Sequence, residues 1–91
     1  MAKPKQSKSE ITSEILPIQI KMARAALGWS IRDLMEKAKV SNDTVNRLER
    51  GEQLRERTLA AVRDALELAG VVFIDANGGG PGVRLKRKPK R

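Results

Sequence analysis

Two short helix signals, separated by only about three residues, constrain the fold of this chain most strongly. Ser30 is a typical helix N-cap residue, and Asp33 three residues later gives an imperfect capping box, which predicts a helix over 31–38. Ser41 caps the next helix, and Gly51 closes it. Because isolated helices of this length are marginal in water, we expect both to pack at a fixed angle on a common core.

The spacing of the apolar residues assigns each of these helices an inner and an outer face. The inner face of the first helix is predicted to contain Ile31, Leu34, Met35 and Ala38. Val40 is expected to fill the turn. In the second helix, Val45 and Leu48 are expected to point toward the core. The outer face of the second helix is polar and consists of Asn42, Asp43, Asn46, Arg47 and Arg50.

Two further helices are predicted on either side of this pair. The first begins near Pro17, a residue tolerated at the first helical position, and ends at Gly28. Its apolar positions are Ile18, Ile20, Met22, Ala23, Ala26 and Leu27. A linker at 52–54 leads to the last helix, over about 55–69, which Gly70 stops. The apolar stripe of this helix consists of Leu59, Val62, Ala65, Leu66 and Ala69.

The C-terminal part of the chain changes from a helical to a strand-like period. Two apolar segments flank a glycine-rich loop there, which is the pattern of a β-hairpin. The predicted fold class is therefore mainly α, with a four-helix domain over 13–70 and a C-terminal β-hairpin over 71–87. Basic tails flank this unit, a disordered one at 1–12 and a short one at 88–91.

The composition excludes several kinds of chemistry. The chain has no Cys and no His, so disulfides, thiolate nucleophiles, zinc sites and His-based catalysis are not expected. The carboxylates show no convergent pair with a candidate base or metal, so we expect no enzyme, no cofactor and no metal. No apolar run approaches the ~18 residues that span a bilayer, and no apolar segment follows the basic N-terminus. We therefore expect a cytoplasmic protein without a membrane partner.

The positive charge lies at the two ends of the chain. The net charge of +8 divides into +3 over residues 1–9, −1 over 10–83 and +6 over 84–91. A nearly neutral body with basic ends fits a domain whose arms bind nucleic-acid phosphates without sequence preference. The alternative is that the ends only increase solubility or bind acidic surfaces weakly.

The chain resembles the Xre-type helix-turn-helix family, the group that contains the phage repressors and Cro proteins. The resemblance covers about residues 18–70, and the segment 34–51 carries most of it. The matching residues are Ser30, Leu34, Ala38, Val40, Ser41, Thr44, Val45, Arg47, Leu48, Glu49, Arg50, Gly51, Thr58 and Leu59. It implies a repressor-like domain that binds double-stranded DNA and inserts the helix at 41–50 into the major groove.

The resemblance also implies roles for individual residues. Arg24 of the first helix would pair with Glu49 and fix the relation between the two helices. Contacts to base edges would come from Asn42, Asp43, Asn46 and Arg47. Contacts to phosphates would come from Ser30, Thr44 and Arg50, with Asn46 also near the backbone.

Elementary chemistry supports some of these roles more than others. The planar fork of Arg47 can donate two hydrogen bonds to guanine O6 and N7, the commonest specific contact to a base. Asn42 lies where a helix N-terminus reaches base edges, but it is equally an additional capping residue beside Ser41. Asp43 either accepts from cytosine N4 or only complements the helix dipole. Arg50 would bind a phosphate, which positions the protein without specifying sequence.

Three positions depart from the family pattern. Ile31 replaces the usual Gln and removes a phosphate-side contact, and Met35 replaces a small residue at a helix crossing. Lys39 replaces the turn Gly and would have to adopt a positive φ or a modified turn at some energetic cost.

The hairpin suggests how two copies would assemble. If Val71 and Phe73 face the helices, then Val72 and Ile74 point the other way. Apolar residues on both faces of a terminal strand favour pairing with a partner. We therefore expect a homodimer through Val72 and Ile74 that recognises a palindromic operator with half-sites one turn, ~34 Å, apart.

The sequence thus predicts a sequence-specific DNA-binding transcriptional regulator that acts as a repressor. One alternative is the antitoxin of a toxin–antitoxin pair, which would repress its own operon and bind a toxin protein through a flexible end or the hairpin. A third possibility is a protein-interaction module that no longer binds DNA, which Ile31 and Lys39 would favour.

Overall fold

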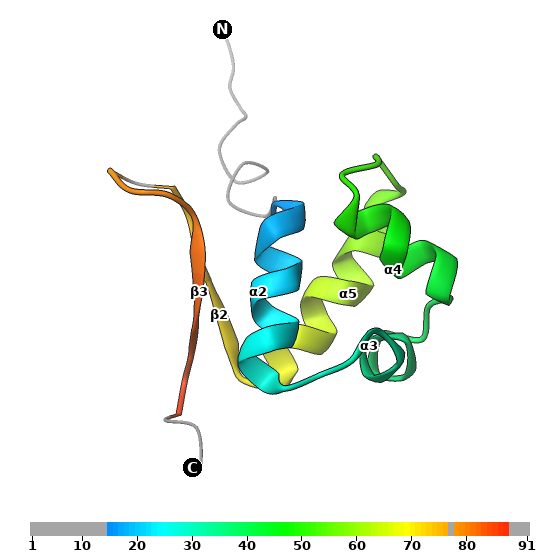
Figure 1. The fold of residues 1–91 in the computed structure, drawn as a ribbon, viewed down its shortest axis with the longest axis horizontal. Coiled ribbons are helices and arrows are strands. Elements are labelled where there is room, and N and C mark those ends of the chain that lie inside the picture. The colour runs from blue at the N-terminus through cyan, green and yellow to red at the C-terminus, as the bar shows by residue number, and fades with distance from the viewer. Residues whose placement is uncertain (1–14, 77, 88–91) are drawn as a thin grey trace, which may run out of the picture.

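The computed structural model describes residues 15–76 and 78–87, and the basic tails expected at 1–12 and 88–91 lie outside these residues. The described residues form four helices followed by an antiparallel hairpin (Figure 1), which confirms the predicted fold class. The helices are α2 (Pro17–Leu27), α3 (Ile31–Ala38), α4 (Asn42–Glu49) and α5 (Glu56–Leu68), and the strands are β2 (Val71–Ile74) and β3 (Gly82–Leu85).

The predicted capping signals define the helix ends. The Ser30 hydroxyl accepts from the Asp33 N–H at 3.1 Å, and the Asp33 carboxylate accepts from the Ser30 N–H at 2.8 Å. Ser41 caps α4 by accepting from the Thr44 N–H. Gly28, with φ +72°, ends α2 in the left-handed conformation that glycine adopts without strain.

Lys39 provides the turn between α3 and α4 in place of the glycine of the family pattern. Its φ of 60° and ψ of 47° lie in the left-handed region, and its N–H donates to the Met35 carbonyl. The turn therefore keeps the expected geometry, and the departure costs conformational energy without changing the path of the chain.

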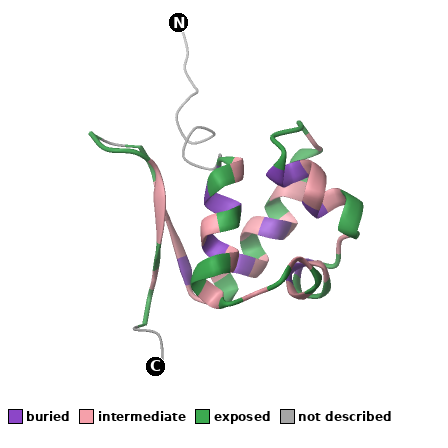
Figure 2. Ribbon diagram, viewed as in Figure 1, coloured by how far each residue is buried: buried purple, intermediate pink, exposed green. Residues whose placement is uncertain are grey.

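The core lies between the inner faces of the four helices and extends to β2 (Figure 2). Leu34, Val45, Val62 and Leu66 are fully buried, and Val71 joins them from β2. Helix α3 packs against α4 and α5, whereas α2 contacts α4 and β3, and α5 contacts β2. Helices α3 and α4 thus contribute the inner faces that their apolar spacing predicts.

Three of the residues counted in the apolar patterns of the helices do not belong to the core. Ile18 is 48% exposed and Ala26 is exposed, whereas the neighbouring Gln19 is buried. Ala69 is also exposed, since α5 ends at Leu68 and Ala69 lies in the turn that follows. On α2 the buried residues are Gln19, Ile20 and Ala23, so a polar side chain shares the inner face of this helix.

Gln19 connects α2 to both strands of the hairpin. Its side-chain amide donates to the carbonyl of Ile74 at 3.1 Å and to that of Gly82 at 3.0 Å, and these two residues are register partners. Its side-chain oxygen accepts from the N–H of Leu16 at 2.8 Å, at the start of α2. Gln19 is only 2% exposed, so its side-chain amide bonds to groups of the protein in place of water.

The hairpin presents one face to the helices and one face away from them. Val71 pairs with Leu85 and Phe73 pairs with Val83, and all four pack on the core. Successive residues of a strand point to opposite faces, so Val72 and Ile74 lie on the outer face. Both are of intermediate burial in the single chain.

We predict that Gln19→Leu lowers the free energy of unfolding by about 3 kcal/mol, because the Ile74 and Gly82 carbonyls lose their donors in a buried site. Urea denaturation measures this change, and Gln53→Leu, at an exposed position in the α4–α5 turn, is the matched control. Equal unfolding midpoints for the two variants would show that Gln19 does not attach the hairpin.

Candidate nucleic-acid interface

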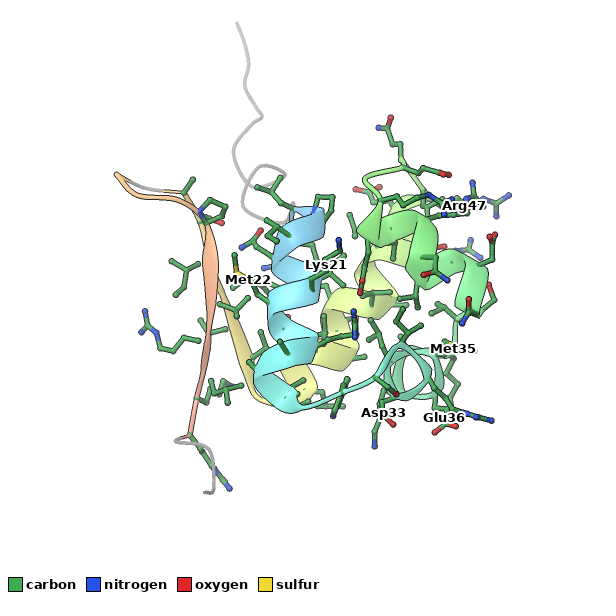
Figure 3. All side chains as sticks on the ribbon, viewed as in Figure 1. Lys21, Met22, Asp33, Met35, Glu36 and Arg47 are labelled. Carbon is green, nitrogen blue, oxygen red and sulfur yellow. The ribbon has the colours of Figure 1, made fainter. Side chains whose placement is uncertain are left out.

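Helix α4 exposes a polar face that the rest of the described chain leaves open. Val45 and Leu48 turn inward and are buried, whereas Asn42 and Asp43 are exposed and Arg47 retains 41% exposure of its side chain. Figure 3 shows Arg47 projecting from α4 away from the helical core. Four of the predicted base-contacting residues therefore share one outer surface, composed of Asn42, Asp43, Asn46 and Arg47.

The polar side chains near the start of α4 are ordered by local hydrogen bonds. The Ser41 hydroxyl donates to the Thr44 hydroxyl at 2.9 Å. One turn further along, the Asn46 side-chain amide donates to the backbone carbonyl of Asn42 at 3.0 Å and also to its side-chain oxygen. These bonds are exposed, and groups of a ligand can exchange with them.

The far end of α4 contains a cluster of two arginines and one glutamate. Glu52 accepts from Arg47 Nε at 2.8 Å through one carboxylate oxygen and from Arg50 Nη2 at 2.7 Å through the other. Arg47 Nη1 also lies 3.7 Å from Asp43 Oδ2, one turn back on the same helix. We name Arg47, Arg50 and Glu52 the α4 charge cluster.

The ionisation of the α4 charge cluster follows from these contacts. The hydrogen bond from Arg47, and next that from Arg50, lowers the pKa of the Glu52 carboxyl. The same bond from Glu52 raises the pKa of Arg47. Since the folded state favours the ionised carboxyl, the cluster is intact at neutral pH and is lost only as the pH falls through the lowered pKa.

The remaining candidate residues lie elsewhere in the fold. The hydroxyl and N–H of Ser30 are exposed at the start of α3, where they form the reciprocal cap with Asp33. Val72 and Ile74 lie on the hairpin, on the opposite side of α2 from α4 (Figure 1). The structure brings the candidate DNA contacts of α4 together and separates them from the candidate dimer contacts.

An ion pair joins α2 to α4 behind the exposed face. Arg24 Nε lies 2.7 Å from Glu49 Oε2, and Arg24 Nη2 lies 3.0 Å from Glu49 Oε1, so the contact is bidentate. Arg24 Nη1 also donates to the Trp29 carbonyl at 3.1 Å. The hydrogen bond to Glu49 raises the pKa of Arg24, although partial burial acts against it.

Glu52 was missed as a member of this site and was expected to be only a linker residue. Its relevance comes from the turn after α4, where Gly51 has φ +93° and the Glu52 N–H donates to the Arg47 carbonyl at 3.0 Å. This 6→1 bond, together with the Gly51 N–H bond to Leu48, forms a Schellman turn that brings Glu52 back beside Arg47. The sequence signal was a carboxylate directly after the closing glycine.

The described residues contain no group of three or more His, Cys, Asp or Glu side chains that could hold a metal ion. Within that same part of the chain, every helix is too short or too polar to cross a membrane.

Comparison with known proteins agrees with this geometry. A family model described as a helix-turn-helix domain matches residues 16–72, which includes all four helices. The comparison with curated proteins gives no match.

We predict that Arg24→Ala lowers the free energy of unfolding by about 3 kcal/mol, because the Glu49 carboxylate, with 7% exposure, would lose its partner in a buried site. The double variant Arg24→Met/Glu49→Leu should recover most of this loss, since no charge is then buried alone. Chemical denaturation of the wild type, Arg24→Met, Glu49→Leu and this double variant gives the coupling energy. Strict additivity of the single changes would contradict a buried pair.

Proposed function

This chain belongs to the helix-turn-helix domain family, and from that premise we propose that it is a sequence-specific double-stranded DNA-binding transcriptional regulator. We place the chain in the Xre-type, repressor-like branch of this family, and we propose that α4 inserts into the major groove. Repression of transcription is the proposed outcome, because a domain that covers an operator blocks other proteins from it.

The exposed polar face of α4 is the observation that carries this proposal. A recognition helix needs an apolar side that fixes it to the domain and a polar side that no other element covers. Val45 and Leu48 provide the first, and the face containing Asn42 and Arg47 provides the second. The width of α4 with its side chains suits the B-DNA major groove of about 12 Å.

The proposed contacts divide between reading bases and binding phosphates. Glu52 engages Arg47 through Nε, and Nη1 makes only a 3.7 Å contact with the exposed carboxylate of Asp43, so the two terminal Nη groups can turn to guanine O6 and N7. Asn42, Asp43 and Asn46 lie along the same face and meet neighbouring base edges. Phosphates are bound by Arg50 at the C-terminal end of α4 and by the hydroxyls of Ser30 and Thr44.

The turn geometry supports DNA binding over a module that has lost this function. For Lys39 the sequence left open a positive φ or a modified turn, and its backbone lies in the left-handed region. Ile31 packs against the core and is not part of the polar face of α4. Neither residue therefore covers that face or removes a side chain from it.

A random-library selection tests the proposed function. Duplexes bound by the protein at moderate salt are enriched over several rounds and sequenced, and we expect one motif with two-fold symmetry. Uniform recovery of all sequences, with binding that weakens steeply as salt rises, would leave only a non-specific charge effect.

We predict that Arg47→Ala reduces affinity for the selected duplex roughly tenfold to a hundredfold and relaxes selection at one base pair, because a bidentate arginine–guanine contact is lost. Arg50→Ala should weaken all duplexes to a similar degree, as loss of a phosphate contact does. Fluorescence anisotropy with selected and scrambled duplexes separates the two effects. Lys86→Ala removes one positive charge beyond β3 and is the control; an equal loss of discrimination in all three variants contradicts the assignment.

We also propose that two copies pair through the outer face of the hairpin, where Val72 and Ile74 lie. One recognition helix with a few base contacts provides limited discrimination, and a second half-site multiplies it. A dimer of this kind would bind half-sites one helical turn, ~34 Å, apart.

Sedimentation velocity tests this assembly. We predict a dimer for the wild type and a monomer for Val72→Lys/Ile74→Lys, since two charges would enter an apolar interface. Circular dichroism confirms that the variant keeps its helices. A wild type that sediments as a monomer both alone and with the selected duplex contradicts the dimer.

A further inference from the structure

Glu52 is the one carboxylate of the described chain that binds both arginines proposed to contact DNA. Each of its two oxygens takes one arginine, at 2.8 Å from Arg47 Nε and 2.7 Å from Arg50 Nη2. The two bonds occupy donors that would otherwise be directed at a phosphate. A planar carboxylate and a phosphate present the same kind of acceptor to a guanidinium group.

The backbone fixes Glu52 in this position. Its N–H donates to the Arg47 carbonyl, and the left-handed Gly51 turns the chain back toward the helix end. The side chain of Glu52 therefore starts next to both arginines and does not have to be ordered by the ion pairs alone. It retains 42% exposure, so a phosphate group can approach and compete for the same donors.

The two kinds of DNA contact respond differently to this competition. A phosphate contact depends on the full positive charge of Arg50. Each phosphate that is neutralised in this way releases counterions. Reading a guanine needs only the terminal Nη groups of Arg47, which Glu52 leaves available while it orients the side chain through Nε. Glu52 therefore opposes phosphate binding and is compatible with base recognition.

We propose that Glu52 is a specificity-determining residue, which weakens binding to non-cognate DNA by competing with phosphates for Arg47 and Arg50 and which positions Arg47 for a base pair. This inference rests on the proposed function and adds to it the residue that sets the ratio between specific and non-specific affinity. The lowered pKa of the carboxyl is consistent with it, since Glu52 stays ionised at the pH of the cell interior.

The test compares Glu52→Gln with the wild type on two probes, a labelled duplex of random sequence and the duplex selected by the wild type. For the random duplex we expect affinity to rise roughly five- to tenfold near 0.1 M salt. The slope of log Kobs against log[salt] should steepen by about 0.9 for each arginine that gains a phosphate. Affinity for the selected duplex should change less, so the specificity ratio falls.

Glu56→Gln is the matched control, because it removes the same charge four residues away on α5. Glu56 is exposed and has no hydrogen-bond or ion-pair partner among the residues that the structure describes. A further comparison introduces Glu52→Gln into the Arg47→Ala/Arg50→Ala background, where it should have no effect on either probe. Thermal unfolding of each variant shows that the fold is kept, since the Glu52 contacts are exposed.

Three outcomes overturn the inference. The first is a specificity ratio that is the same in Glu52→Gln as in the wild type. The second is an equal rise in the affinity of Glu56→Gln for the random duplex, which would indicate a general charge effect. The third is a full effect of Glu52→Gln in the Arg47→Ala/Arg50→Ala background. Failure of the proposed function looks different: the wild type then enriches no motif, and its affinities for both probes are equal before any residue is changed.

Discussion

The bidentate contact between Arg24 and Glu49 is the interaction on which the presentation of α4 depends. It joins the last turn of α2 to the last turn of α4 over two hydrogen bonds of 2.7 and 3.0 Å, and the same guanidinium binds the Trp29 carbonyl before α3 begins. One side chain thus connects α2, the turn before α3, and α4. Two short helices cannot maintain their mutual angle by local hydrogen bonds alone, and a directional contact with little exposure to water provides that restraint.

Helix α2 performs a second connecting role through Gln19. On one side of α2 this amide binds both strands of the hairpin, and on the other side Arg24 binds α4. Helix α2 therefore positions both α4 and the hairpin, although none of its residues is proposed to contact a base. A change in the rotation of α2 would therefore move both α4 and the hairpin.

The polar groups that the exposed surface of α4 is proposed to offer to DNA already bind one another. Asn46 bonds to Asn42, and Arg47 and Arg50 share Glu52, so polar groups proposed to face DNA already have partners in the free protein. These partners are exposed and exchangeable, unlike the buried pair of Arg24 and Glu49. Binding DNA therefore exchanges one set of hydrogen bonds for another, and the difference between cognate and non-cognate DNA decides how favourable that exchange is.

The sequence by itself determined the features that depend on residues close together in the chain. Ser30 with Asp33, Ser41 with Thr44, and the glycines at 28 and 51 fix the helix ends through contacts within a few residues, and the apolar spacing of α3, α4 and α5 identifies most of the core. Only the tertiary structure decided the burial of Gln19, because its partners lie 55 and 63 residues away. The physical reason is that a polar residue is buried only when distant groups satisfy its hydrogen bonds, and those groups meet it only after the chain has folded.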